Sequence, residues 1–467
     1  MFRAFLSLLL CAAFADSGPL IAAQMPGNAP QAACLADGQV EDILVVDGVA
    51  YLAGRFQNVR PPGEVIGGPL EVARNWFAAC DVATGAVLAW DPRATCDPGS
   101  FPTCANNPRG QTLALSADRQ SIYLGGKFRG IGGVPGTPRR HAARVSRATA
   151  ALDPTWLPEP NDRVQRLVVA PDGARVYIAG NFTAVGGCNT TPCHAYLAAV
   201  SPATGLLDAT FDPSIESDGG AFATVYAVAL SQDSQTLYLG GEFDTVNTIR
   251  RSGAAAVDSA TGTTATLFAP ALTDTNPNDA EVQVYDIQVD RDWIYLCGDW
   301  WATEGIGDQQ NQRNVNRFAP SSGAVDPGFW IATDGGVQAC ALDPDLGVLF
   351  VGGHFDCVRA WLDSTTPVEA NPPQCGTDPL FVGTQQRDLF ALTVADGTLL
   401  PWNPDTAGAA GTWALTRANG RLLVGGQLAW PRTGTATHQS LLAYPLPLFA
   451  DGFEQENSDR WSTTFPP

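Results

Sequence analysis

The chain of 467 residues is long enough for about three domains at the usual size of roughly 150 residues each. Its 48 glycines and 35 prolines, with 45% hydrophobic and 16% charged residues, indicate a globular protein rich in turns. Acidic residues outnumber basic ones by 47 to 27, which gives a net charge of −20. This charge repels phosphate and anionic lipid, so it argues against nucleic acid and membrane surfaces as partners.

The first residues have the layout of a secretory signal. Arg3 precedes an apolar run over residues 4–15 that is too short to span a bilayer. We expect a signal peptide over residues 1–23, with cleavage after Ala15 as the alternative. Cys11 follows Leu10, where a lipoprotein signal has a small residue, so no lipid anchor is expected. The protein would then be secreted, periplasmic or on the exterior of a Gram-negative bacterium, without a membrane span.

Ten cysteines follow this signal, an even number that favours disulfides in an oxidising compartment. Proximity in the sequence suggests the pairs Cys96–Cys104, Cys188–Cys193 and Cys357–Cys375, and elimination then leaves Cys34–Cys80 and Cys297–Cys340. Spacing alone does not fix this connectivity. A metal site is the alternative, but Cys188 and Cys193 lack a second ligand pair at a suitable spacing.

A motif of an apolar strand, a glycine pair and an aromatic residue recurs seven times. It reads Tyr-Leu-Gly-Gly-Lys-Phe at residues 123–128 and Tyr-Leu-Gly-Gly-Glu-Phe at 238–243. The other copies, some of them variants, lie at residues 51–56, 177–182, 295–300, 350–355 and 423–428. The final residues of the first and last copies, Phe56 and Leu428, are 372 positions apart, a mean repeat of 62. We expect these final residues to belong to the core and the glycines to let neighbouring backbones approach.

Each repeat is expected to hold four antiparallel strands, because apolar residues alternate and no helical period appears. In the third repeat these strands include residues 164–169, 196–200 and 206–211. A tight turn before the fourth strand has glycine, which suits positive φ, in five repeats and Ala150 in the second. Seven such units predict an all-β fold, a seven-bladed β-propeller, because radial closure protects the sheet edges.

The propeller is expected over residues 31–450, followed by a short tail over residues 451–467. The expected blades span about residues 40–92, 110–157, 164–213, 225–270, 284–330, 337–404 and 412–449. The seventh repeat ends near Tyr444, so its outer strand comes either from residues before Val40 or from residues 446–449. The sequence leaves this choice open.

The pattern Tyr-x-Gly-Gly-x-Phe, followed by a basic residue and Leu-Ala-x-Val-Asp-x-x-Thr-Gly, resembles the delta-60 repeat of bacterial β-propeller proteins. The resemblance covers all seven repeats and is strongest in the third and fourth. It implies the fold but no activity, because the function of the family is unknown and it has no assigned catalytic residues. Residues 448–454 and Trp461 also resemble a C-terminal tail of exported proteins from some proteobacteria.

Strand order assigns the loops to two faces. First-to-second and third-to-fourth turns lie on one face, which we call the short-turn face. Second-to-third loops and the connections between repeats lie on the other, the long-loop face. All the long insertions fall on the long-loop face: residues 58–73, 92–108, 272–280, 302–312 and 357–386. Recognition tends to use loops on a rigid scaffold, so this face is the expected binding face, with tolerated insertions as the alternative.

The innermost strands begin on the long-loop face, at the mouth of the expected channel. Their second positions are Glu41, Gln111, Gln165, Tyr226, Tyr285, Gln338 and Trp413. Amides, a carboxylate and aromatic rings suit a neutral polyhydroxyl ligand such as a glycan. The alternative is a mouth lined by ordinary polar residues that bind nothing.

A basic residue opens the third strand of every repeat. These residues are Arg74, Arg139 or Arg140, His194, Arg251, Arg313, Arg387 and His438. Because a binding site rarely needs seven equal contributors, we expect each to pair with a carboxylate or carbonyl of its own or the next repeat.

One segment resembles the start of a calcium loop, with oxygen ligands at Asp274, Asn276, Asn278 and Asp279. It lacks the glycine at the sixth place and the glutamate at the twelfth, so a polar turn is the alternative. No other cofactor is expected.

No nucleophile elbow, phosphate loop or His-Glu-x-x-His motif is present, and the four histidines fall in separate repeats. The composition does not exclude catalysis, yet nothing favours it. We expect an exported, monomeric, non-enzymatic propeller that binds a glycan or a protein. The alternatives are a secreted polysaccharide hydrolase or lyase and a structural surface protein without a discrete ligand.

Overall fold

The structure is a computed structural model that describes most of residues 25–446. The described residues are 25–31, 33–96, 106–133, 136–186, 188, 193–218, 222–273, 282–303, 313–329, 331–360, 384–404, 406–430 and 437–446. This part of the chain contains no α-helix, and therefore no helix that could cross a membrane. The expected signal peptide and tail lie outside it.

Seven three-stranded antiparallel sheets follow one another along the chain, one for each repeat, and we call them units 1 to 7. Units 1 to 4 are β2 (Val40–Val46), β3 (Val49–Gly54) and β6 (Phe77–Asp81); β7 (Arg109–Leu115), β8 (Ser121–Lys127) and β11 (Ala142–Ser146); β12 (Val164–Val169), β13 (Val176–Gly180) and β14 (Leu197–Val200); β16 (Thr224–Leu230), β17 (Thr236–Glu242) and β20 (Ala254–Asp258). Units 5 to 7 are β22 (Gln283–Val289), β23 (Ile294–Asp299) and β25 (Val315–Phe318); β27 (Val337–Asp343), β28 (Val348–Gly353) and β31 (Leu389–Thr393); β32 (Ala407–Ala418), β33 (Arg421–Trp430) and β34 (Thr437–Pro445).

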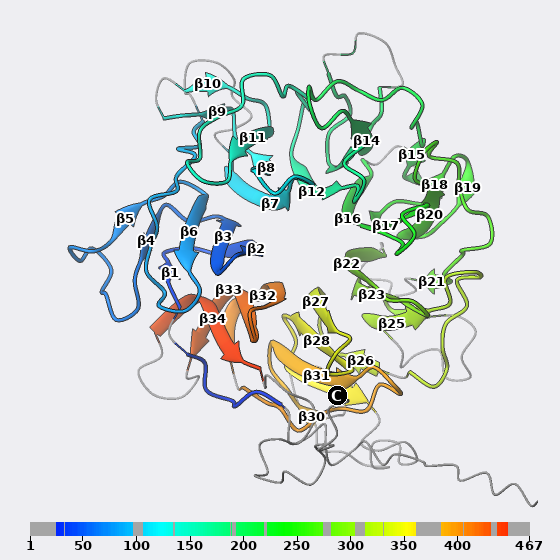
Figure 1. Ribbon diagram of the computed structural model, residues 1–467. Coiled ribbons are helices and arrows are strands. Elements are labelled where there is room, and N and C mark those ends of the chain that lie inside the picture. The colour runs from blue at the N-terminus through cyan, green and yellow to red at the C-terminus, as the bar shows by residue number, and fades with distance from the viewer. Residues whose placement is uncertain are drawn as a thin grey trace, which may run out of the picture.

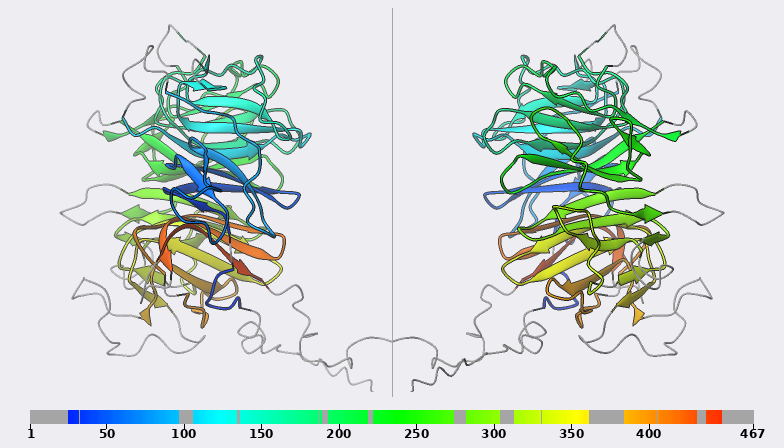
Figure 2. Two further views of the ribbon diagram at one scale, coloured as in Figure 1. Left: turned by 90° about the vertical axis from the view of Figure 1, so that its left-hand side faces the viewer. Right: turned by 90° about the vertical axis from the view of Figure 1, so that its right-hand side faces the viewer.

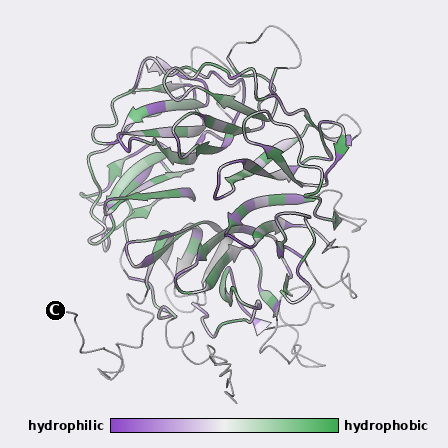
Figure 3. Ribbon diagram, turned by 45° about the vertical axis from the view of Figure 1, so that its right-hand side comes forward, coloured by the Kyte–Doolittle hydropathy of each residue, from purple (hydrophilic) through white to green (hydrophobic). Residues whose placement is uncertain are grey.

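The seven units form a closed ring (Figure 1). The first strand of each unit contacts the first strand of the next, from β2 through β7, β12, β16, β22 and β27 to β32, and β32 contacts β2 again. Hydrophobic core clusters lie between neighbouring units, such as the cluster that joins Leu52 of unit 1 to Leu423 of unit 7. Seen edge-on the ring is a thick disc (Figure 2), and hydrophobic residues alternate with hydrophilic ones along its strands (Figure 3).

The expected fourth strand is present in units 1 to 6 only as a single bridge to the third strand. Val200 and Leu207, for example, form this bridge in unit 3. The segment then leaves the sheet because an aromatic residue turns inward onto the second-strand Tyr or Phe. The six ring pairs have centroids 4.9 to 5.8 Å apart: Tyr51–Trp90, Tyr123–Trp156, Tyr177–Phe211, Tyr238–Phe268, Tyr295–Phe329 and Phe350–Trp402.

The segment before unit 1 completes unit 7, which answers the question that the sequence left open. Gln31 bridges Ala443 of β34, and its amide donates to the Ala443 carbonyl at 2.6 Å. Three residues later, Cys34 forms a disulfide with Cys80 of β6 in unit 1. One short stretch of chain therefore links the last unit to the first.

The second glycine of each motif is required by a close approach inside its own unit. A Cβ atom there would lie only 2.1 to 2.3 Å from a carbonyl oxygen of the first strand or of the residue just before it, for example 2.1 Å from Thr224 O at Gly241. The first glycine instead faces side chains of the next unit, as Gly240 faces Val284. The expected approach of a neighbouring backbone is therefore found at the second glycine, whereas side chains approach the first. The final residues of the motif are core as predicted, being at most 4% exposed: Phe56, Phe128, Phe182, Phe243, Trp300, Phe355 and Leu428.

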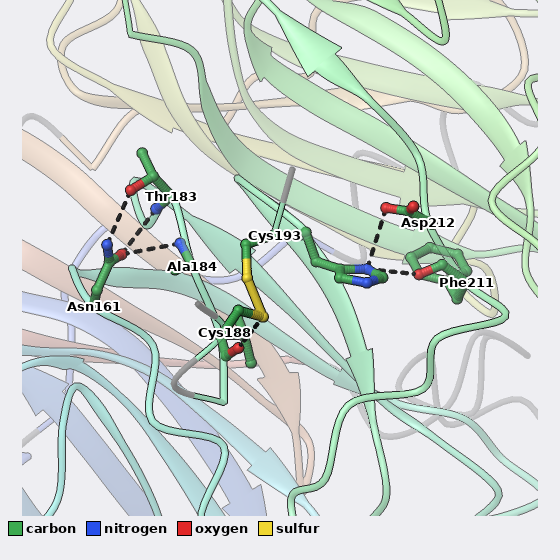
Figure 4. Close-up of a disulfide and its surroundings, with 9 residues drawn as sticks. Asn161, Thr183, Ala184, Cys188, Cys193, Phe211 and Asp212 are labelled. Carbon is green, nitrogen blue, oxygen red and sulfur yellow. Dashed lines mark hydrogen bonds and ion pairs between the residues drawn. A yellow bond between two sulfur atoms is a disulfide. The ribbon is translucent and has the colours of Figure 1, made fainter. Parts of the chain in front are cut away.

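Small sheets cover the long-loop face. In most units, the connection from the preceding unit pairs with the second-to-third loop. These strands are β1 (Leu35–Ala36), β4 (Asn58–Arg60), β5 (Val72–Ala73), β9 (Gly130–Ile131), β10 (Thr137–Pro138), β15 (Ile215–Glu216), β18 (Thr245–Val246), β19 (Ile249–Arg250), β21 (Leu272–Thr273), β24 (Ala302–Thr303), β26 (Ile331–Thr333), β29 (Cys357–Ala360) and β30 (Thr384–Gln385). In unit 3, Asn161 takes this role with its side chain, which bonds to Thr183 and Ala184 (Figure 4).

Three of the five predicted disulfides are confirmed: Cys34–Cys80, Cys188–Cys193 and Cys297–Cys340. Cys297 replaces the first glycine of its motif, and its bond to Cys340 joins unit 5 to unit 6. Cys96 and Cys357 are also disulfide-bonded. Their expected partners, Cys104 and Cys375, lie outside the described residues.

Candidate functional site

All seven predicted mouth residues occupy one structural position, the extra residue of a β-bulge. The pairing of the first strand with the second skips residue 41 between Val40 and Asp42, and it skips residues 111, 165, 226, 285, 338 and 413 in the same way. A bulge residue has no ladder partner, and its side chain is re-aimed out of the regular strand. The repeated bulge therefore places one side chain of each unit at the long-loop end of its first strand.

In four units the bulge residue contacts the residue that stands between the glycine pair and the aromatic residue. Glu41 forms an ion pair with Arg55, and Tyr226 donates to Glu242 at 2.9 Å. Gln165 Nε2 lies 2.9 Å from Asn181 Oδ1, and Gln338 Nε2 lies 2.5 Å from His354 Nδ1. This second ring of positions also holds Lys127, Asp299 and Gln427.

This second ring was not predicted from the sequence, although its signal was present. The Gly-Gly-x-Phe motif marks position x in every repeat, and x is polar or charged in all seven: Arg55, Lys127, Asn181, Glu242, Asp299, His354 and Gln427. The register that brings x beside the bulge residue depends on the bulge, and alternation of apolar residues does not reveal a bulge. Charge at the mouth was therefore underestimated.

Arginines gather on one half of the mouth, in units 1 to 3. Arg109 Nη1 lies 3.2 Å from Glu41 Oε1, the same oxygen that Arg55 contacts. Burial lowers the pKa of Arg109 to about 10, with Glu41 opposing this shift and the charges of Arg55 and Arg163 adding to it. Lys127, the only lysine of the chain, is the ladder partner of Arg109. Arg55 and Arg109 thus contact Glu41 directly, and the charges of Glu41 and Asp162 also act on Arg163.

Arg163 has no carboxylate partner within 4.0 Å in the described part of the chain. Its Nε donates to Asn181 Oδ1 at 3.1 Å. If the Gln165 amide is turned, its own side-chain oxygen accepts a hydrogen bond from Arg163 Nη2 at 2.6 Å. The guanidinium of Arg163 therefore has a neutral polar neighbour in either orientation of this amide. The side chain of Glu41 is fully buried, and its Oε2 has no hydrogen-bond partner among the described residues.

The other half of the mouth is aromatic and acidic. The rings of Tyr226 and Tyr285 lie 5.2 Å apart, and Gln283 bonds to both Tyr285 and Glu242. A Cβ on Gly336 would lie 2.9 Å from Asp299 Oδ2 and 3.0 Å from a carbon of the His354 ring, so these two groups converge there.

An ion pair crosses the ring immediately below the mouth. Arg166, next to the bulge in unit 3, lies 3.7 Å from Asp286 of unit 5. Asp42 of unit 1 accepts from the Leu113 amide at 2.7 Å; burial raises its pKa, and the charge of Arg166 opposes this. This ion pair would lie directly beneath a ligand bound at the mouth.

The basic residues of the third strands have structural contacts, as expected, wherever the structure describes their side chains. Arg74, Arg139, His194 and Arg251 each interact with a carbonyl of the fourth segment of their own unit, at 2.8 to 3.3 Å. Arg313 donates to Thr333 O at 2.9 Å, and Arg387 lies 3.4 Å from Asp356. His194 also lies 3.3 Å from Asp212 (Figure 4). The side chain of His438 lies outside the described part of the structure.

The remaining predictions concern metal and histidine chemistry. The expected calcium ligands Asp274, Asn276, Asn278 and Asp279 lie outside the described residues. Within those residues, no group of three or more His, Cys, Asp or Glu side chains could hold a metal ion. His141 is completely buried, which lowers its pKa to about 3, so it is neutral at physiological pH.

Comparison with known proteins finds structural similarity and no family. No known family pattern and no curated protein matches this chain. Solved structures similar to it include the computationally designed Ika8 protein, 11% identical with a TM-score of 0.42, covering 88% of this chain and 98% of Ika8. Another is the WD40 β-propeller domain of Doa1, 12% identical with a TM-score of 0.43, covering 89% of this chain and 97% of that one. The chain is all-β and structurally similar to β-propeller proteins.

Proposed function

We propose that this protein is an exported seven-bladed β-propeller of delta-60 repeats that binds an acidic glycan at its long-loop mouth. The arginine cluster carries the proposal. Arg55 and Arg109 contact the carboxylate of Glu41, and the charge of Arg163 acts on Arg109, in a protein whose net charge is −20. Keeping like charges together under partial burial is costly, so such a cluster is typical of a site for an anion.

The neighbouring residues suit the sugar part of such a ligand. The amides of Gln111, Gln165 and Gln338 are suited to hydroxyl groups, and the tilted Tyr226–Tyr285 pair offers ring faces for stacking. The Arg166–Asp286 pair lies below the mouth. It favours a ligand that lies across the mouth over one that passes through the centre of the ring.

The test is binding of the mature protein to arrays of neutral, uronate and sulfated oligosaccharides. We expect binding to acidic oligosaccharides that weakens at least tenfold in the variant Arg55→Gln/Arg163→Gln and weakens with added salt. The matched control is Arg119→Gln, an exposed arginine that pairs with Asp47 on the short-turn face and should leave binding unchanged. Equal binding to neutral and acidic oligosaccharides, or equal loss in the control, would reject an arginine-based site.

A further inference from the structure

The short-turn face has a repeated contact between neighbouring units. A tyrosine of the second strand donates its hydroxyl to the second residue of the next unit's third-to-fourth turn. Tyr51 donates to Arg147 O at 3.2 Å, Tyr123 to Pro202 O at 3.0 Å, and Tyr177 to Ser259 O at 2.7 Å. Each of these contacts closes part of the groove between two units.

An arginine fills the same groove at three interfaces. Arg144 donates to Pro202 O at 3.0 Å, and Arg175 donates to Ser259 O at 3.4 Å. Arg317 donates to Val394 O and, at 3.0 Å, to Ala395 O. Its guanidinium also lies 4.8 Å from the centre of the Phe329 ring. The chain itself thus shows that a guanidinium fits a groove of this shape.

The groove between units 4 and 5 lacks both contacts. Tyr238 is 4% exposed and lines this groove, yet its hydroxyl has no hydrogen bond to any residue that the structure describes, including Pro320 at the corresponding turn position. The two positions that supply arginine elsewhere hold Ala256, opposite Tyr238, and Thr236. The cavity measures about 380 Å³, against about 220 Å³ where Arg144 lines the groove between units 2 and 3.

The lining of this cavity favours a cation. Its charged residues are Asp233 and Asp290 against a single Arg291, and the Pro320 turn adds carbonyl oxygens. We propose that the groove between units 4 and 5 binds the guanidinium of an arginine side chain from a protein partner. The guanidinium would lie over Tyr238 as Arg144 lies over Tyr123, where the separation is 5.8 Å. This site lies on the opposite face from the proposed glycan mouth and does not depend on it.

Tyrosine-labelled protein tests the proposal by NMR, because the chain has only nine tyrosines. We expect N-acetyl-arginine methylamide to shift the Tyr238 signal saturably, and a short arginine-containing peptide to do so at lower concentration. Thr236→Arg, which places an arginine where unit 3 has Arg175, should weaken binding at least tenfold, whereas Thr236→Ser should not.

Asp233→Asn provides a second test that does not require filling the groove. It keeps an acceptor for the turn contacts of Asp233 with Ser231 and Gln235, so the fold should persist, and binding should weaken about threefold. Absence of a saturable Tyr238 shift would overturn the proposal. The proposal would also be overturned if neither Asp233→Asn nor a correctly folded Thr236→Arg variant changed the affinity for the arginine ligand.

Discussion

Two buried ionisable residues should give this protein opposing pH dependences of stability. Asp388 is 6% exposed, and burial, together with the nearby charge of Asp356, raises its pKa to about 8. The folded protein therefore holds a proton on Asp388 that the unfolded chain has lost above about pH 4. The contribution of Asp388 to the free energy of unfolding is complete below about pH 4 and declines as the pH rises towards 8.

The variant Asp388→Asn isolates this effect. The residue has φ of 59°, a left-handed conformation that asparagine tolerates, so the backbone should not be disturbed. We expect the variant to be more stable than the parent at pH 8 and nearly equal to it at pH 4. Urea denaturation at both pH values measures the difference, and a stability difference independent of pH would contradict the assignment.

His141 should act in the opposite direction. Its pKa of about 3 in the folded protein is below the usual value of 6.5, so the unfolded chain binds the extra proton. Its contribution to stability is complete above about pH 6.5 and is lost as the pH falls towards 3. His141→Asn should flatten the acid side of the stability profile, as followed by thermal melting between pH 4 and 7. An unchanged slope would show that another group controls it.

At the scale of strands, the two glycines of each motif differ in what they tolerate. Gly241→Ala would place a Cβ 2.1 Å from a backbone carbonyl, so we expect destabilisation by about 3 kcal/mol or more. Gly240→Ala is the matched control, because its nearest neighbour is a Val284 methyl group and because two other repeats have Ala53 and Ala179 at this position. Chemical denaturation should find Gly241→Ala much less stable, and equal losses would disprove the difference.

The disulfide Cys34–Cys80 secures the segment that closes the ring. Replacing both cysteines with serine should cost on the order of 2–4 kcal/mol, since the bond closes a loop with a sequence separation of 46. We expect hydrogen exchange to speed up first in β34, where Gln31 pairs, and in β6. Uniform acceleration around the ring would show that the bond has no special role in closure.

At the scale of the whole molecule, the repeat in the sequence was enough to predict seven all-β units, because glycine pairs and apolar alternation report directly on strands. It did not predict that the fourth strand shrinks to one bridge, although an aromatic residue shortly before a proline, as at Trp90 and Pro92, marks where the chain turns inward. Ring closure by residues before Val40 was one of two alternatives that the sequence left open, because the single bridge of Gln31 leaves no periodic pattern.

The common position of the mouth residues was predicted from the sequence, whereas the charge of their neighbours was not. The count of positions along the first strands correctly placed Glu41, Gln165 and Tyr226 at the same end of the ring. The partners Arg55, Asn181 and Glu242 come from the second strand, and only the bulge register brings them alongside. The charges of these partners are why the glycan proposed above is acidic and not neutral.

Hydrogen–deuterium exchange with and without a saturating oligouronate tests the central claim most directly, because it reports where a ligand binds. We expect protection at the long-loop ends of β2, β7 and β12, together with residues 54–57, and no change in the short-turn loops. Protection confined to the short-turn face, or none at these three strands while the oligouronate is bound, would contradict a glycan site at the mouth.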